Sequence, residues 1–490
     1  MSTLTSQPSV LATRRGKLTL ALLAAVAFLD FVDGPIVNVA LPSIRHALHF
    51  SVQGLQWVPS AYLLTYGGLM LLGGRAADLF GRRRVLLAGV VVIGVASLIG
   101  GFAQTSGVLI GARLAQGVGA ALSLPAALSI LTTTFSEGKD RNAALGAWGA
   151  VGGLASAAGV LLGGVLTAGP GWRWVMFVNP VAVPLVLVGI FRLIGREGPR
   201  PRVQNLDVGG AVLVTAGMLL LVYALVKAPD VGWGKTRTIA ELAGAAALLV
   251  AFVVNELRVK NPLAPLSIFR INGLGFADAT QLIGFVGFLA IFFFLTLYMQ
   301  NVLGYSALHT GLAYLPLTLV AIVGAGVGSQ ALNRVGTRPL MFVGALITAG
   351  GIFWLSRIPV HGSYVSDLLP GMLLVGLGIT PMFVAVATAA NAGVPADKAG
   401  LAASLLNASQ QLGGALGLAI LTAVATSQTH HQLAAHSSPS HALVSGFQHA
   451  LFIGAIFLVA AAFIALRATN TRGEQSAHQA LEAVPEPAAP

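Results

Sequence analysis

The 490-residue sequence contains no cysteine, and only 9% of its residues are charged, whereas 56% are hydrophobic. The absence of cysteine excludes a disulfide framework, a thiolate metal site and a thiol nucleophile. A soluble domain carries about 25% charged residues, and a single soluble core stops growing beyond roughly 250–300 residues. So much apolar sequence therefore indicates a protein whose solvent is largely the lipid bilayer.

The few charges that are present are mostly basic and give a net charge of +12. The Lys and Arg residues lie between apolar segments and do not form a run with interleaved aromatics. This distribution is typical of membrane topology and argues against a nucleic-acid partner. The segment GWGKT at 232–236 lacks the first glycine of a P-loop, so we find no nucleotide site and expect an ion gradient to supply energy.

Long apolar segments recur along the whole chain. A membrane-crossing helix needs about 20 mostly apolar residues, and windows of that length predict an all-α polytopic protein with fourteen spans. The polar or Pro/Ala-rich tails, 1–17 and 468–490, are predicted to be disordered. The predicted spans are 18–41, 53–73, 84–103, 107–131, 143–167, 173–193, 207–226, 239–257, 274–302, 308–331, 339–356, 367–390, 399–426 and 447–467.

The positions of Lys and Arg predict the orientation. With the N-terminus inside, 21 of the 28 basic residues fall in inner segments or tails, six fall in outer segments, and Arg113 lies within a span. Basic residues favour the cytoplasmic side, so both termini are expected there and the protein in the inner (cytoplasmic) membrane. The exceptions, in outer segments, are Arg45, Arg173, Lys227, Lys235, Arg237 and Arg357.

A faint internal repeat divides the chain. Setting Gly81 on Gly336 aligns the loop after the second span with the loop after the tenth, and places Asn333 opposite Asp78. This offset of eight spans predicts two six-span halves around a midplane site, which is the architecture of transporters. The predicted units are a bundle at 18–193, two additional spans at 207–257 and a bundle at 272–467.

The first span carries two acids beside a helix breaker, in FLDFVDGPIVNVALP at 28–42. Asp30 and Asp33 are three residues apart and share a helix face. A charged carboxylate at the bilayer centre costs about 2.5–3.5 kcal/mol, so these groups must face water or a cation, or be protonated. Surroundings that alternate between wet and dry make a carboxylate take up and release a proton. Alternatively, one Asp simply hydrogen-bonds a neighbouring helix.

Arg113 is the only basic residue predicted inside the spans, and it remains charged in any protein environment. It either holds the fourth span in place through an ion pair or tunes the proton site. An aromatic stripe in the ninth span suits a flat apolar guest, or is ordinary helix packing. The candidate substrate-path residues are Asn38, Tyr62, Gln116, Phe285, Phe288, Phe292, Asn407 and Gln410.

Four motifs, in chain order, carry a family resemblance: DGPIVNVALP (33–42), GRAADLFGRRR (74–84), LIGARLAQGVGAA (109–121) and GVLLGG (159–164). Together they resemble the major facilitator superfamily, specifically its fourteen-span drug:proton antiporter branch, over roughly 18–467. Two positions depart from the pattern. Pro35 stands where a Thr is usual, and Val160 replaces the proline of the antiporter motif in the fifth span.

The resemblance implies two six-helix bundles plus two additional helices, with proton coupling through Asp33, Asp30 and Arg113. It implies that the loop after the second span latches the two halves in one state, with Asp78 near the start of the thirteenth span at Lys398–Gly400. The implied latch residues are Gly74, Asp78, Gly81, Arg82 and Arg83. The glycines expected to pack helices closely are Gly117, Gly119, Gly159, Gly163 and Gly164.

These features together predict a monomeric antiporter that exports amphipathic, cationic or neutral, drug-like compounds in exchange for protons by alternating access. No nucleophile–base set indicates an enzyme, and we expect no metal or cofactor beyond the coupling proton. The histidines between 430 and 441 are interpreted as a solvated loop. Alternatives are export of a lipid, siderophore or self-made antibiotic, an uptake symporter, or a non-transporting sensor or scaffold, which would leave the buried charges unexplained.

Overall fold

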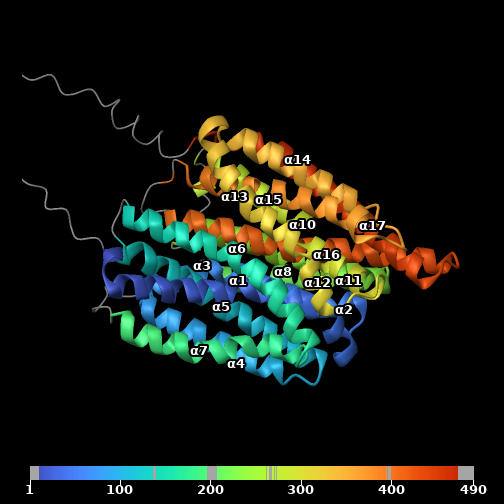
Figure 1. The fold of residues 1–490 in the computed structure, drawn as a ribbon, viewed down its shortest axis with the longest axis horizontal. Helices are drawn as coiled ribbons and strands as arrows, with labels where there is room; N and C mark the ends of the chain where they lie inside the picture. The colour runs from blue at the N-terminus through green and yellow to red at the C-terminus, as the bar shows by residue number, and fades with distance from the viewer. Residues whose placement is uncertain are drawn as a thin grey trace, which may run out of the picture.

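In the computed structural model, the described residues are 10–135, 139–195, 207–260, 262–263, 268–269, 271, 273–392, 394 and 399–472. Within these ranges the regular secondary structure is entirely helical, and long helices run side by side along one common direction (Figure 1). The expected all-α polytopic fold is confirmed.

After the opening 3-10 turn, helices α1 to α7 form the first bundle, and helices α8 to α17 follow along the chain. These are η1 (Val10–Ala12), α1 (Arg14–Leu48), α2 (Val52–Leu55), α3 (Trp57–Phe80), α4 (Arg82–Gly101), α5 (Ser106–Thr134), α6 (Lys139–Ala168) and α7 (Arg173–Leu193). They are followed by α8 (Val208–Val231), α9 (Thr236–Arg258), α10 (Leu274–Phe288), α11 (Ala290–Asn301), α12 (Ala307–Ala313), α13 (Leu315–Val335), α14 (Thr337–Leu355), η3 (Tyr364–Leu368), α15 (Leu369–Asn391), α16 (Ala399–Ala434) and α17 (Pro439–Ala465).

Thirteen helical segments of the described chain are long and apolar enough to cross a membrane. The remaining predicted span is α3, whose 24 residues reach about 36 Å at 1.5 Å per residue. Its hydropathy is lowered by polar side chains such as Tyr62, Thr65 and Tyr66, all buried inside the bundle. All fourteen predicted spans therefore correspond to helices.

Local hydrogen bonds hold residues 10–17 and 468–472, which are predicted from sequence to belong to the tails. Thr13 caps α1 by accepting a hydrogen bond from the Gly16 amide at 2.9 Å, so the helix begins at Arg14. At the other end, the Thr337 amide donates to the Thr471 carbonyl at 2.9 Å. Residues 1–9 and 473–490 lie outside the described chain.

The predicted histidine loop is also shorter than expected. α16 continues to Ala434 and α17 begins at Pro439, where Ser438 caps it by accepting from the His441 amide at 3.4 Å. Three of the histidines therefore lie on helices, and His436 lies in the turn with a left-handed φ of 61°.

The turns after α3 and α13 are built alike. Gly81 ends α3 and precedes α4 with φ 105°, and Gly336 ends α13 and precedes α14 with φ 85°. Residues with a side chain rarely adopt such positive φ values, which explains why both positions are glycine. The faint sequence repeat thus corresponds to a repeated helix–turn–helix unit.

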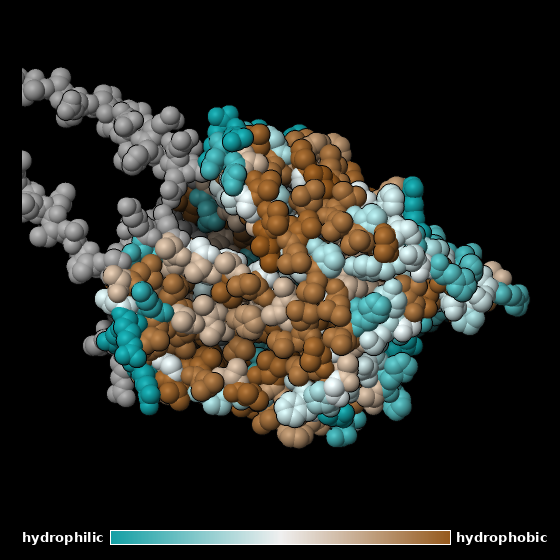
Figure 2. All heavy atoms as spheres, in the orientation of Figure 1, coloured by the Kyte–Doolittle hydropathy of each residue, from teal (hydrophilic) through white to brown (hydrophobic). Residues whose placement is uncertain are grey.

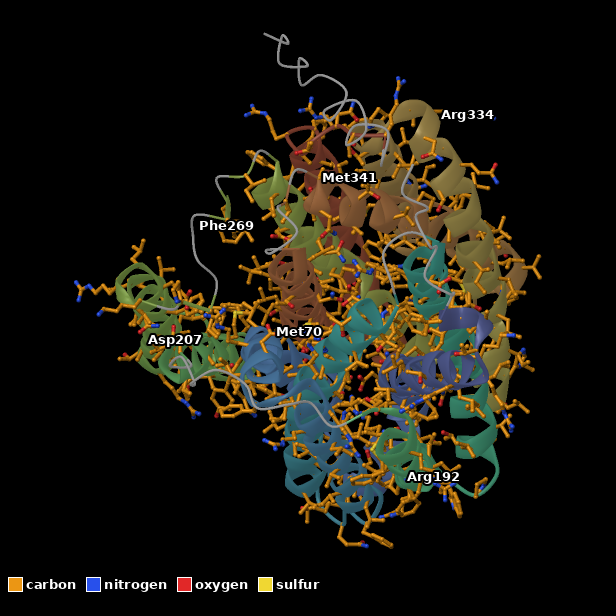
Figure 3. The ribbon with its side chains drawn as sticks, turned by 90° about the vertical axis from the view of Figure 1, so that its left-hand side faces the viewer. Met70, Arg192, Asp207, Phe269, Arg334 and Met341 are labelled. Atoms are coloured by element: carbon orange, nitrogen blue, oxygen red, sulfur yellow. The ribbon has the colours of Figure 1, made fainter. Side chains whose placement is uncertain are left out.

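The hairpin of α8 and α9 lies at one edge of the molecule. α8 packs on α3 of the first half and on α16 of the second half. Figure 3 views the bundle from the end where the chain termini lie: Asp207 marks the start of the hairpin at one edge, and Met70 of α3 lies nearer the middle.

The two halves meet through α3 and α16 along much of the bundle, whereas α6 meets the second half closely toward one end. We call the end where α1 begins and α17 ends the termini end, and the opposite end the far end (Figure 1). At the far end, Gly164 of α6 packs against Ala307 and Leu308 of α12, and the Gln300 side-chain amide donates to the Val39 carbonyl at 2.9 Å.

Toward the termini end, α6 of the first half and α13 of the second half diverge. A Cβ built at Gly149 of α6 or Gly326 of α13 would meet nothing within 4 Å. Figure 2 shows a hollow between the two halves at this end. The structure is therefore closed at the far end and open at the termini end.

Candidate transport site

A buried ion pair joins the first and fourth spans. The Arg113 guanidinium on α5 binds the Asp33 carboxylate on α1, and the two residues are only 1% and 5% exposed. Removing one partner of a buried ion pair typically costs about 3–5 kcal/mol, because the other charge is left uncompensated. The state of Asp33 is thus strongly coupled to the position of α5.

Arg113 is held from three further directions. Its Nε donates to the Val58 carbonyl of α3 at 2.9 Å, and its Nη1 also donates to the Gln116 side chain at 2.9 Å. The Tyr62 ring lies under the guanidinium, 4.6 Å from its central carbon, in a cation–π contact. A planar, always-charged group with several donors suits this position, which a lysine ammonium would satisfy less completely.

The network continues away from the ion pair through neutral side chains. Gln116 donates to the Ser97 hydroxyl on α4 at 2.6 Å, and Asn179 on α7 donates to the same hydroxyl at 3.1 Å. Five helices, α1, α3, α4, α5 and α7, thereby contribute to one buried polar network. Gln116 therefore lies inside the first bundle as part of this network.

Asp30 lies one turn before Asp33 and is 7% exposed. Its carboxylate accepts a hydrogen bond from the Ser123 hydroxyl of α5 at 3.1 Å. The two acids therefore share a helix face, as predicted, but have different partners: Asp33 has a cation and Asp30 a neutral hydroxyl. Asn38, five residues beyond Asp33 on α1, is half-buried.

Small residues bring these helices together. A Cβ on Gly117 would meet the Thr65 side chain and the backbone of Tyr62 on α3, and one on Gly119 would meet the backbone of Gly89 on α4. Gly159 and Gly163 of α6 likewise pack against the backbone of α1, next to Pro35 and Ile36. This close approach is what places Arg113 within reach of Val58.

In the second half, the predicted stripe forms part of an aromatic cluster. Phe285 stacks on Phe383 of α15 with ring centroids 4.6 Å apart, while Phe288 and Phe292 meet edge to face at 5.5 Å. Phe292 also lies 5.5 Å from the Tyr314 ring. Phe285 is buried, whereas Phe288, Phe292 and Phe383 are half-buried.

Polar groups of α10 and α16 lie next to this aromatic cluster. The Gln281 side chain donates to the Gln410 side chain at 3.2 Å. Asn407, one turn before Gln410, donates to the Ala403 carbonyl of its own helix at 2.9 Å. Asp278 is 5% exposed, and within the described part of the chain neither carboxylate oxygen accepts a hydrogen bond.

The residues expected to form a latch lie at the termini end of the first bundle. Arg82 donates to the Thr133 hydroxyl at 2.9 Å, and Arg83 donates to the Phe191 carbonyl at 3.2 Å. Asp78 is exposed, and Gly74 lies 3.7 Å from Ser404 of α16, measured from a built Cβ. The expected partner Lys398 lies outside the described residues, so the latch stays a prediction.

Comparison with known families decides what kind of protein this is. A family model described as Major Facilitator Superfamily matches residues 23–418. The chain belongs to the major facilitator superfamily. It is a multi-pass membrane transporter and not an enzyme.

Two relatives within the superfamily cover most of this chain. The puromycin resistance protein pur8 of Streptomyces alboniger is 40% identical over 90% of this chain and 88% of its own length. The cephamycin export protein CmcT of Amycolatopsis lactamdurans is 39% identical over 89% of this chain and 90% of its own. Among solved structures, the POT family transporter PepTSo superposes with a TM-score of 0.67 at 17% identity, covering 92% of this chain and 97% of that one, which shows a shared fold.

The sequence analysis did not identify several residues of the buried polar network. Ser97, Ser123 and Asn179 are single polar side chains in apolar segments, a weak signal among many similar residues. Phe383 lies on a different helix from the predicted stripe, so spacing alone cannot associate them. Within the described residues, no group of three or more His, Asp or Glu side chains is placed to hold a metal ion.

Proposed function

We propose that the chain is a proton-coupled antiporter that exports amphipathic drug-like compounds across the cytoplasmic membrane by alternating access. The observation that carries this proposal is the buried pair of Asp33 and Arg113. Burying two charges in a membrane bundle costs free energy, and a change of charge on one member during function explains why the pair is present.

A proton provides that change. Protonation of Asp33 removes the negative charge that faces Arg113, and the guanidinium keeps the Val58 carbonyl, the Gln116 side chain and the Tyr62 ring. The proton dissociates again when the pair re-forms. Because the pair links α1 to α5, each protonation change alters how these two helices pack within the first bundle.

The arrangement of basic residues supports an inward-open state. The termini end carries Arg82, Arg83 and Arg334, and basic residues favour the cytoplasmic side. With that orientation the hollow between the halves opens to the cytoplasm, where an exporter collects its cargo. The inward movement of one proton down 100 mV contributes about 2.3 kcal/mol.

The names of the relatives support cargo of the antibiotic type. One is a puromycin resistance protein and one a cephamycin export protein, and both cover this chain at nearly full length. Export of a self-made antibiotic by the same machinery is therefore the second candidate, and it differs only in the range of compounds accepted.

The test is transport in proteoliposomes with an imposed pH gradient. We expect dye export by the parent protein, its loss in Asp33→Asn, and parent-like export in Asp230→Asn, which removes an exposed acid at the far end of α8. Undiminished export in Asp33→Asn would show that Asp33 is not the coupling group. Export that survives collapse of the gradient would remove proton coupling altogether.

A further inference from the structure

The strongest unassigned feature is the face of α10 that lies between its contacts with α15 and α16. α15 meets α10 at Gly284, α17 meets it at Gly287, and α16 meets it at Leu282 and Val286. At 100° per residue, these contacts occupy three directions and leave one sector between α15 and α16. The residues of α10 that project into this sector are Asp278, Gln281, Phe285 and Phe288, and Phe292 of α11 extends the row through its edge-to-face contact with Phe288.

This sector faces the first half of the molecule. Its continuation, α11, packs against α1, where the Gln300 side chain donates to the Val39 carbonyl at 2.9 Å. From that contact toward the termini end, α6 and α13 of the two halves diverge. The sector therefore borders the space between the halves, and two side chains flank it: Phe383 from α15 and Gln410 from α16.

The sector combines an acid with aromatic rings. Asp278 lies seven residues before Phe285, so the two positions are about 10 Å apart along the helix. The carboxylate is 5% exposed and accepts no hydrogen bond within the described chain, and the Gln281 side-chain oxygen likewise has no donor there. Buried polar groups without partners are costly and are usually satisfied by a ligand, water or ion.

We propose that this sector is a binding site for aromatic organic cations, with Asp278 as the group that selects positive charge. The inference rests on the proposed export function and narrows its cargo. An ammonium group at Asp278 supplies a counter-charge and hydrogen-bond donors that the described residues do not provide. The aromatic part of the same molecule lies against Phe288, which is about 15 Å from Asp278 along the helix. The half-buried ring of Phe288 offers both stacking area and cation–π attraction.

Two fluorescent probes of the same shape test the proposal. Dansylcadaverine carries an aromatic dansyl group and a primary ammonium at the end of a five-carbon chain, and its N-acetyl derivative is neutral. Binding of each to the purified full-length protein in detergent is followed by dansyl fluorescence. We expect the parent to prefer the ammonium form by about tenfold or more, which is the loss expected for one charge-assisted contact.

Asp278→Asn should abolish this preference and leave binding of the acetylated probe unchanged, whereas Asp278→Glu should keep the preference. Phe288→Ala should weaken both probes. Asp230→Asn is the matched control and should bind both as the parent does. Size-exclusion profiles and melting temperatures check that each variant is folded.

The proposal is overturned if the preference survives in Asp278→Asn, if both probes weaken together in that variant, or if the folded parent binds neither probe. The binding assay contains no gradient, so its result is separate from the proton-coupling experiment. Loss of coupled export with intact cation preference would reject the antiport mechanism and keep the site.

Discussion

A single methyl group added at Gly117 should destabilise the transporter and disturb its charged site. Gly117 of α5 faces α3, and a Cβ there would lie against the Thr65 hydroxyl, the Tyr62 carbonyl oxygen and the Tyr66 amide nitrogen. Two of these three atoms belong to the backbone and cannot rotate away. Overpacking typically costs about 1–3 kcal/mol, and we expect Gly117→Ala to fall near the upper value.

Gly111 offers a control in the same helix. A Cβ at Gly111 would meet nothing within 4 Å, and Ala is favoured over Gly in a helix by about 0.5–1 kcal/mol. The two variants should therefore differ in stability by about 3.5–4 kcal/mol. Unfolding in mixed detergent–dodecyl sulfate micelles, followed by circular dichroism, measures the difference.

The consequence of Gly117→Ala for transport follows from Tyr62. A shift of the Tyr62 backbone moves its ring away from Arg113, so export should slow as well. Equal stabilities for Gly117→Ala and Gly111→Ala would refute the claim that close α3–α5 contact positions the site.

Two further predictions use the same structure. The chain has no natural cysteine, so pairs of introduced cysteines report on the distance between the halves. Gly164→Cys with Leu308→Cys should cross-link the far end readily and stop transport, whereas Gly149→Cys with Gly326→Cys should not cross-link in detergent. Equal cross-linking of both pairs would contradict the inward-open state. Arg113→Lys keeps the charge but loses the Nε hydrogen bond and the planar fork, so proton-driven export should fall by about tenfold or more in proteoliposomes, and full activity would show that guanidinium geometry is not required.

The fold was largely predictable because the bilayer imposes a simple rule on length and polarity. Each predicted span corresponds to a helix, and even the internal repeat could be read from Gly81 and Gly336, since both need a positive φ. The ends were less predictable. The extension of α1 back to Arg14 depends on the cap at Thr13, and the order of the C-terminal segment depends on a contact with Thr337, which is remote in sequence.

The site was predictable only where a residue is unusual in its surroundings. Asp30, Asp33 and Arg113 stand out because charge is costly inside a membrane. Their pairing did not follow from spacing, because it depends on how α1 and α5 are rotated and how closely glycines let them pack. Whether an apolar stripe faces a neighbour or the space between the halves likewise depends on tertiary contacts.

The hairpin of α8 and α9 makes the transporter lopsided in the plane of the membrane. Because α8 contacts both α3 and α16, it covers one flank of the interface between the two halves. On the opposite flank, α6 and α13 touch near Gly153 and Ile322 and then part toward the termini end. We therefore expect a lipophilic molecule dissolved in the adjacent leaflet to approach the space between the halves beside α6 and α13, because α8 covers the other flank.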